Sequence, residues 1–336
     1  MPVRPGRLAS TLLAGLLVLG LAGCETTAEP PAPPPEERPA PPPPPPPPPP
    51  VPAPAPTPTR PPALPQTSAE SLALQQYYRR LQADLLSQGL LRGDGGGADA
   101  PFTNTMLARN FTAIALYDEY ATTSAGSLVA QAQESRLRRW DKPIRMEIVF
   151  GPSVSPEQQA RDRSSITAYA ARLSRLTGVP ITQVEENANF HVAVLSEDDR
   201  EGFEPRLRDM VPGIAPSSVR AFLNVPRSTL CLVVAFGSGE GAGYSQAVAL
   251  IRAEHPELLR SACIHEELAQ GMGLANDSPQ ARPSIFNDDE EFGLLTRHDE
   301  FLLQMLYDPR LRTGMTAAEA EPVVQRIASE LLNPPS

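Results

Sequence analysis

A run of prolines divides this chain into two parts that must fold differently. Of its 41 prolines, 23 lie between Pro30 and Pro65, and Pro41 to Pro50 are uninterrupted. Proline fixes φ and removes the backbone N–H donor, so this segment favours an extended polyproline II spacer over a helix or a central strand. The 271 residues that follow contain 16 prolines, which is close to the ordinary globular level. We therefore expect a disordered proline-rich tether and, after it, enough chain for one large or two small domains.

The amino terminus is typical of a secretory signal. Arg4 and Arg7 precede an apolar stretch, residues 8–21, which is too short for a transmembrane span. The stretch ends in Leu21-Ala22-Gly23-Cys24, which resembles a bacterial lipobox. The resemblance implies that Cys24 is lipidated and attaches the chain to a membrane. Because Glu25 stands where inner-membrane lipoproteins carry aspartate, it also implies the outer membrane, with the domain facing the periplasm. A plain signal peptide with an incidental cysteine is the alternative.

The rest of the chain predicts an α+β fold. Apolar residues at three- and four-residue spacing predict helices at Ser68–Leu91, Thr105–Tyr120, Leu128–Arg139, Pro156–Leu176, Pro256–Gly271 and Arg297–Leu306. Branched and aromatic residues predict strands at Ile144–Phe150, Phe190–Leu195, Leu230–Phe236 and Ser245–Ala253. The predicted layout is a signal peptide at 1–23, a lipidated cysteine and linker at 24–66, a helical region at 67–142, and a domain with strands and C-terminal helices at 143–336.

One segment carries most of the functional information, the eleven residues from Glu266 to Asn276. It resembles the metzincin motif His-Glu-x-x-His-x-x-Gly-x-x-His, in which three histidines hold zinc and the glutamate is the general base. Laid on this sequence, the three zinc-ligand positions fall on Glu266, Gln270 and Asn276, the general base on Glu267 and the hinge on Gly273. The skeleton of the motif is present, and the histidines are replaced.

Two downstream segments extend this resemblance. Ser284-Ile285-Phe286 is similar to the metzincin methionine turn, with Phe286 at the methionine position, and Leu295 to Asp299 is similar to the start of the last helix. The resemblance covers residues 144–307 and implies a metzincin-like, or zincin-like, mixed sheet followed by the motif helix, with the predicted helical region and the tether before it.

The replaced ligands bear directly on chemistry. Zinc is held by neutral imidazole or thiolate, and an amide oxygen is a poor substitute. Glu266, Gln270 and Asn276 form an all-oxygen set that suits a harder ion but, with one formal charge, binds it weakly. Without a tightly held metal, Glu267 has no water to activate. We expect no cofactor, with a weakly bound divalent metal as the alternative.

The remaining cysteines, Cys231 and Cys263, form an even pair. In an oxidising compartment such a pair can form a disulfide, although buried free cysteines are also common. The chain also resembles a proteobacterial lipoprotein family that contains a domain of unknown function. The resemblance rests on the lipobox, the tether, and the residues Cys263, Glu266, Glu267, Gln270 and Asn276. The predicted helical region Thr105–Trp140 is expected to belong to that family as well.

Two further observations narrow the function. Of the histidines, His265 is out of register with the motif and is expected to face away from the cleft, while His191 lies in an apolar strand and is expected to pack there. The formal charge of −10 argues against a general affinity for nucleic acid.

The first hypothesis for the function is a non-catalytic envelope lipoprotein that binds a periplasmic peptide, glycan or protein. The alternatives are a hydrolase that uses Glu267 with a non-standard metal, and a purely structural tether protein.

Overall fold

The computed structural model describes residues 66–122, 128–237, 239, 243–287 and 289–333. The residues from Pro61 onward form one compact unit. The predicted signal peptide, Cys24 and nearly all of the tether lie outside the described residues. Within them, no helix combines the length and the apolar character that crossing a membrane requires.

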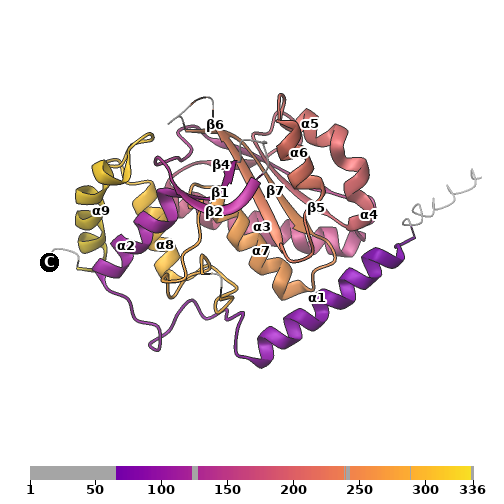
Figure 1. Ribbon diagram of the computed structural model, residues 1–336, viewed down its shortest axis with the longest axis horizontal. Coiled ribbons are helices and arrows are strands. Elements are labelled where there is room, and N and C mark those ends of the chain that lie inside the picture. Colours follow the sequence, from indigo (N-terminus) through magenta and orange to yellow (C-terminus); the bar gives the residue numbers. More distant parts are fainter. Residues whose placement is uncertain (1–65, 123–127, 238, 240–242, 288, 334–336) are drawn as a thin grey trace, which may run out of the picture. The chain divides into compact units, whose positions relative to one another are not determined.

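A five-stranded mixed sheet forms the centre of the fold (Figure 1). Its strands are ordered β4 (Ile181–Gln183), β3 (Ile144–Phe150), β5 (Phe190–Leu195), β7 (Tyr244–Arg252) and β6 (Cys231–Gly237). The first four are parallel, and β6 runs antiparallel to β7 at the edge, with Cys231 opposite Ile251. The predicted bounds of β3 and β5 are confirmed, and those of β6 and β7 differ by one residue at each end.

Side chains alternate between two cores on opposite faces of this sheet, as the period-two geometry of a strand requires. Val192 and Val194 of β5 join a core with the helices α3 (Pro156–Thr177) and α7 (Glu257–Gln270). Ala193 and Leu195 join a second core with α5 (Glu204–Met210) and α6 (Pro216–Leu223). Because both faces are covered, β5 is buried at every position, and its sequence is therefore continuously apolar except at His191.

Local signals explain the long helix that connects β3 to β4. The Ser155 side chain accepts a hydrogen bond from the Gln158 N–H, and Pro156 occupies the first turn, where no donor is lost. The helix ends at Gly178, whose φ of 74° is the left-handed conformation that glycine adopts without strain. The predicted helices at Pro156, Pro256 and Arg297 are confirmed, the last as α8 (Arg297–Leu306).

The predicted helical region differs from the expectation in one element. After α1 (Ala69–Ser87) and α2 (Asn104–Ala115), the chain forms a hairpin of β1 (Tyr117–Thr122) and β2 (Leu128–Glu134). The helix predicted at Leu128–Arg139 is therefore wrong, and the helix predicted to reach Tyr120 ends at Ala115. Alanine and glutamine favour a helix, but intrinsic propensity is a weak preference, and pairing with β1 outweighs it.

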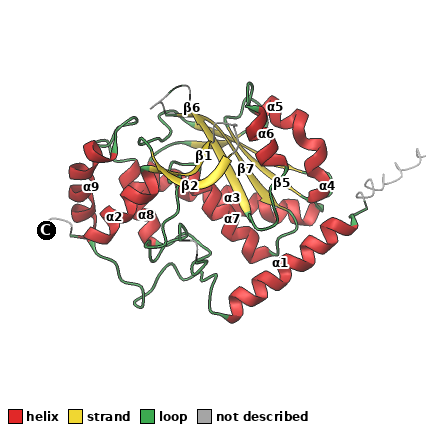
Figure 2. Cartoon of the chain, in the orientation of Figure 1, coloured by secondary structure: helices red, strands yellow, loops and turns green. Residues whose placement is uncertain are grey.

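Helices α2 and α9 (Ala317–Leu332), which are far apart in the sequence, pack together beside the sheet (Figure 2). Phe111 and Ile114 of α2 share a core with Val324 and Ile327 of α9 and with α8. The short helix α4 (Glu197–Arg200) and a 3-10 turn (Glu201–Phe203) follow β5. The fold is thus a mixed α/β arrangement in which helices alternate with strands instead of preceding them.

Candidate functional site

The motif helix α7 begins directly after β7 and is fixed at both ends. At its start, the Gln82 side chain of α1 accepts a hydrogen bond from the Leu259 N–H, which has no partner within the helix. At its end, the Trp140 Nε1–H donates to the Gly271 carbonyl oxygen at 2.8 Å. Glu267 and Gln270 are buried on this helix, and Glu266 is half-buried.

The turn after α7 requires glycine at Gly273, the hinge position of the motif. Its φ is +124°, and a Cβ there would lie 2.3 Å from the Arg138 carbonyl oxygen. We expect Gly273→Ala to lower the free energy of unfolding by about 3 kcal/mol, because both the backbone conformation and the contact become strained. Urea unfolding followed by circular dichroism measures this. Gly202→Ala is the control, since a Cβ there meets nothing within 4 Å, and an equal loss in both variants would contradict the explanation.

A small acidic pocket lies between α7 and the edge strand β6. Its volume is about 200 Å³. One wall consists of the consecutive residues 228–233, which belong to β6 and the loop before it, and the rest is polar. The polar lining is Glu266, Glu267, Gln270, Asp277 and Glu290. None of the lining residues that the structure describes is lysine, arginine or histidine, so the pocket favours a cation.

The three predicted ligand positions do not converge. Glu266 and Gln270 line the pocket, and the Gln270 Nε2 lies 3.4 Å from an Asp277 carboxylate oxygen. Asn276 instead donates a side-chain N–H to the Ala113 carbonyl oxygen at 2.8 Å. Its backbone N–H donates to the Ile114 carbonyl oxygen. Its amide therefore fastens the motif turn to α2. The neighbouring Asp277 lines the pocket in its place, and an acidic residue directly after the motif was the signal that could have identified it.

The donor set does not fit the zinc of a metzincin-type site. The carboxylates and the Gln270 amide offer oxygen, and the sulfur of Cys231 is held in a disulfide with Cys263. The four histidines do not line this pocket. Zinc sites in proteins include imidazole or thiolate ligands besides any carboxylate, so with the disulfide formed the residues of this pocket argue against a zinc-dependent reaction.

The disulfide joins β6 to α7 beside the pocket. Its Cα atoms are 5.8 Å apart, and Cys231 also lines the pocket wall. The Cys231 Sγ lies 3.9 Å from a Glu266 carboxylate oxygen. Because a disulfide sulfur carries no proton, this is a contact between the two side chains and not a hydrogen bond.

The histidines are packed into the fold. His265 stacks on the Tyr169 ring at 4.0 Å, and its Nδ1 accepts a hydrogen bond from the Leu295 N–H, on the side of α7 away from the pocket lining. Burial, with a smaller effect of Arg172, lowers its pKa to about 4. His191 lies 2.9 Å from a Glu147 carboxylate oxygen across the β3–β5 pair. Burial lowers the pKa of His191 despite this partner. His191 is therefore packed in its strand and His265 faces away from the pocket, as predicted for each.

The segment that resembles the methionine turn is tied to α8 by one buried carboxylate. Asp299, in the first turn of α8, accepts hydrogen bonds from the Ser284 hydroxyl, the Ile285 N–H and the Thr296 N–H. Asp299 and Phe286 are fully buried. The carboxylate therefore sets the path of residues 284–286 relative to the helix.

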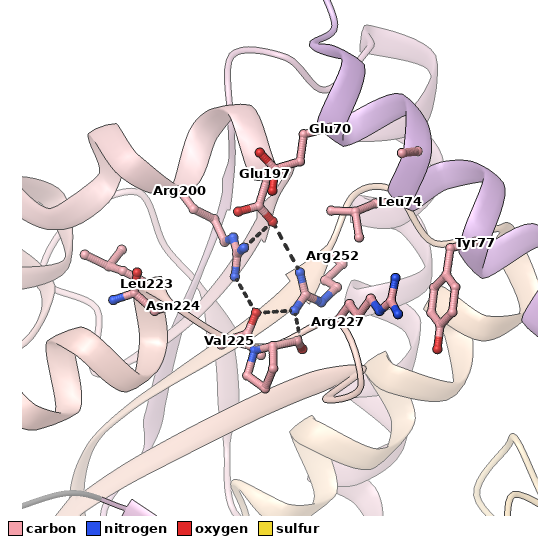
Figure 3. Close-up of a pocket in the computed structure, with 12 residues that line it drawn as sticks. Glu70, Leu74, Tyr77, Glu197, Arg200, Leu223, Asn224, Val225, Arg227 and Arg252 are labelled. Atoms are coloured by element: carbon pink, nitrogen blue, oxygen red, sulfur yellow. Dashed lines mark hydrogen bonds and ion pairs between the residues drawn. The ribbon is translucent and has the colours of Figure 1, made fainter.

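A second pocket, of about 520 Å³, lies under α1 and has a different character (Figure 3). The guanidinium groups of Arg200 and Arg252 converge on the Val225 carbonyl oxygen, and Glu197 pairs with both. Arg252 donates further bonds to the carbonyl oxygens of Pro226 and Thr229. These arginines hold the loop before β6 in place, so we assign this pocket a structural role.

Comparison with known proteins gives a family but no activity. No curated protein matches the chain. A family model described as a protein of unknown function, DUF2927, matches residues 104–326, which run from the start of α2 into α9 and include the whole acidic pocket. The match includes Thr105–Trp140, so the expectation that this region belongs to the family's domain is confirmed. The chain belongs to the DUF2927 family.

Proposed function

We propose that this chain is a non-catalytic binding protein of the cell envelope, whose edge strand β6 takes up an extended peptide segment of a periplasmic protein. The observation that carries the proposal is an edge strand beside an acidic pocket that has neither histidine nor thiolate to hold zinc. The lipobox at Cys24 and the proline-rich tether support placement at the outer membrane, with the domain reaching into the periplasm. At about 3.1 Å per residue, a 36-residue spacer spans up to roughly 110 Å.

The order of elements supports a metzincin-like core. A mixed sheet followed directly by the motif helix is the arrangement that the resemblance implies, and α7 starts five residues after β7 ends. The turn at Ser284 to Phe286 and the start of α8 follow in the order of the motif segments, joined by Asp299. In this proposal the protease shape is retained while its metal ligands have been lost.

The edge strand supplies the physical basis for peptide binding. Among the described residues, β6 pairs only with β7, so its other side presents backbone N–H and C=O groups. An added strand satisfies these groups with main-chain hydrogen bonds, which is a common mode of peptide recognition. Residues 228–233 line the pocket, so a peptide on this edge passes the carboxylates of Glu266 and Glu267. We therefore expect a lysine or arginine side chain to enter the pocket.

The surface available to a peptide continues beyond this pocket. Asp277 also lines a larger groove, of about 840 Å³, between α2, α9 and residues 276–280. Its walls combine apolar groups such as Ala113 and Ala317 with polar ones such as Arg109 and Gln280. Most of a longer ligand can therefore be bound by the second groove while the acidic pocket selects one basic side chain.

The alternative function is a metal-dependent peptidase or hydrolase with Glu267 as general base. It is favoured by one observation, the placement of Glu267 in the pocket beside Glu266. Elemental analysis of the purified protein distinguishes the two: one tightly held transition metal per chain, with peptidase activity lost in Glu267→Gln, would overturn the binding proposal.

Peptide binding is tested with residues 61–336, the compact unit, and two labelled pentapeptides, Val-Thr-Lys-Thr-Val and Val-Thr-Glu-Thr-Val, capped at both ends. We expect fluorescence anisotropy to show the lysine peptide binding about tenfold more tightly, equivalent to about 1.4 kcal/mol. Replacing both Glu266 and Glu267 by glutamine should reduce this preference below twofold. Glu186→Gln, near the opposite edge of the sheet, is the matched control. Equal binding of both peptides, or none, would refute the proposal.

A further inference from the structure

The disulfide holds a sulfur atom next to two carboxylates. One potential ligand atom from each of Cys231, Glu266 and Glu267 lies within 4.8 Å of the other two. The sulfur comes from β6, and both carboxylates come from α7. In the disulfide state this cluster is a poor metal site, because only a thiolate is an effective sulfur ligand.

We propose that the Cys231–Cys263 disulfide gates a metal site, in which reduction frees a Cys231 thiolate that binds a zinc-class divalent ion together with Glu266 and Glu267. The reductant is a dithiol, either a small molecule or the active site of a thiol oxidoreductase. One of its thiolates attacks the Cys231 sulfur, and Cys263 leaves as a thiolate that takes up a proton. The second thiol of the reductant then displaces Cys231 and closes the reductant's own disulfide. Metal binding releases the Cys231 proton to solvent.

The change in donor chemistry accounts for the gating. Two carboxylates alone form a hard site with weak affinity for a transition metal in water. A thiolate adds a third negative charge and the soft ligand that zinc prefers, with metal–sulfur and metal–oxygen distances of about 2.3 Å and about 2.0 Å. Three donors no more than 4.8 Å apart can meet these distances after small side-chain rotations. Breaking the sulfur–sulfur bond gives Cys231 the freedom to rotate.

The fold also accommodates the other sulfur after reduction. Cys263 is 1% exposed, and its Sγ lies 3.7 Å from the Nδ1 of His255. Burial, followed by Arg252 and Arg260, holds the pKa of His255 well below its ordinary value, so the imidazole is neutral. A neutral ring nitrogen can accept a hydrogen bond from the thiol, which gives the buried Cys263 a partner. Reduction therefore does not leave an unsatisfied group at this position.

The two sulfur atoms differ in access, which favours attack at Cys231. Both cysteines belong to the main core, but Cys231 also lines the acidic pocket and is 9% exposed, whereas Cys263 is 1% exposed. A reductant thus reaches the sulfur that afterwards becomes the ligand. The inference does not depend on peptide binding, and a failure of the peptide experiment would leave it intact.

The test uses Co²⁺ as a spectroscopic substitute for zinc. Residues 61–336 are stripped of metal, reduced with dithiothreitol, and freed of reductant without exposure to air. We expect the reduced protein to bind one Co²⁺ with the near-ultraviolet charge-transfer absorption that marks a thiolate ligand. Zinc should displace the Co²⁺. The reduced protein should bind zinc with a dissociation constant at least about a hundredfold lower than that of the oxidised protein.

Matched variants separate this site from incidental thiol binding. Cys263→Ser leaves Cys231 permanently free, so it should bind Co²⁺ with the same absorption in the absence of any reductant. Cys231→Ser also removes the disulfide but should lose the absorption, and Glu266→Gln should weaken zinc binding to the reduced protein at least tenfold. Glu186→Gln should have no effect. The proposal is overturned if Cys231→Ser and Cys263→Ser bind alike, or if the reduced protein unfolds and zinc does not restore its circular dichroism.

Discussion

Replacing Asp299 by alanine is expected to lower the free energy of unfolding by about 3–5 kcal/mol, the largest effect of any single substitution considered for this protein. The carboxylate is fully buried and accepts hydrogen bonds from Ser284, Ile285 and Thr296. Its removal leaves three donors without an acceptor, and each buried unsatisfied donor costs about 1–3 kcal/mol. Urea unfolding monitored by circular dichroism measures the loss. Asp299→Asn should lose less, because the amide keeps one oxygen acceptor.

A matched control isolates the contribution of burial. Glu319 occupies the same capping position on α9, where its carboxylate accepts from the Thr316 N–H, but it is exposed. Removal of an exposed cap costs about 1 kcal/mol, so Glu319→Ala should lose far less stability than Asp299→Ala. Similar losses in the two variants would show that Asp299 acts only as a helix cap and not as the link to residues 284–286.

The second large effect is expected from removal of the Cys231–Cys263 disulfide. The two cysteines are separated by 32 residues, and the loop-closure model assigns about 3–4 kcal/mol to a bridge of that length. Residues 61–336 contain no other cysteine. Chemical reduction in the presence of EDTA should therefore lower the midpoint of urea unfolding in a single step. EDTA is included because metal bound to the reduced protein would restore part of the stability.

The control for this prediction is the double variant Cys231→Ala/Cys263→Ala. It should be about as unstable as the reduced protein, and adding dithiothreitol should not change it further. A reduced protein as stable as the oxidised one would mean that the packing of β6 against α7 fixes this junction without the covalent bond.

Much of the sheet could be predicted from the sequence because most of its strands are rich in branched and aromatic residues. Phe190–Leu195 is buried throughout, and such a run between turn residues has few alternatives to a central strand. The helices α3 and α8 could be predicted because serine or threonine caps mark their starts. The three-residue strand β4 was missed because its pairing with β3 defines it, and a single sequence contains no signal for that pairing.

The pocket was harder to predict than the fold, because the side on which a residue lies depends on tertiary contacts. The motif placed Glu266, Glu267 and Gln270 on one helix, and these residues do share the pocket. After Gly273 the chain leaves the helix, and helical spacing no longer applies. Asn276 donates hydrogen bonds to the carbonyl oxygens of Ala113 and Ile114 instead of lying in the pocket. This contact between segments 163 residues apart could not be read from local pattern, and it is what brings Asp277 into the pocket.

The hydrogen bond from Leu259 to Gln82 has a consequence for where this domain begins. The family model starts at residue 104, yet α1 lies before that point, supplies the cap of the motif helix and packs Tyr78 against His255. The evolutionary unit and the folding unit are therefore not the same length. A fragment cut at the family boundary would leave the first turn of α7 without its side-chain acceptor and would uncover the buried face of His255.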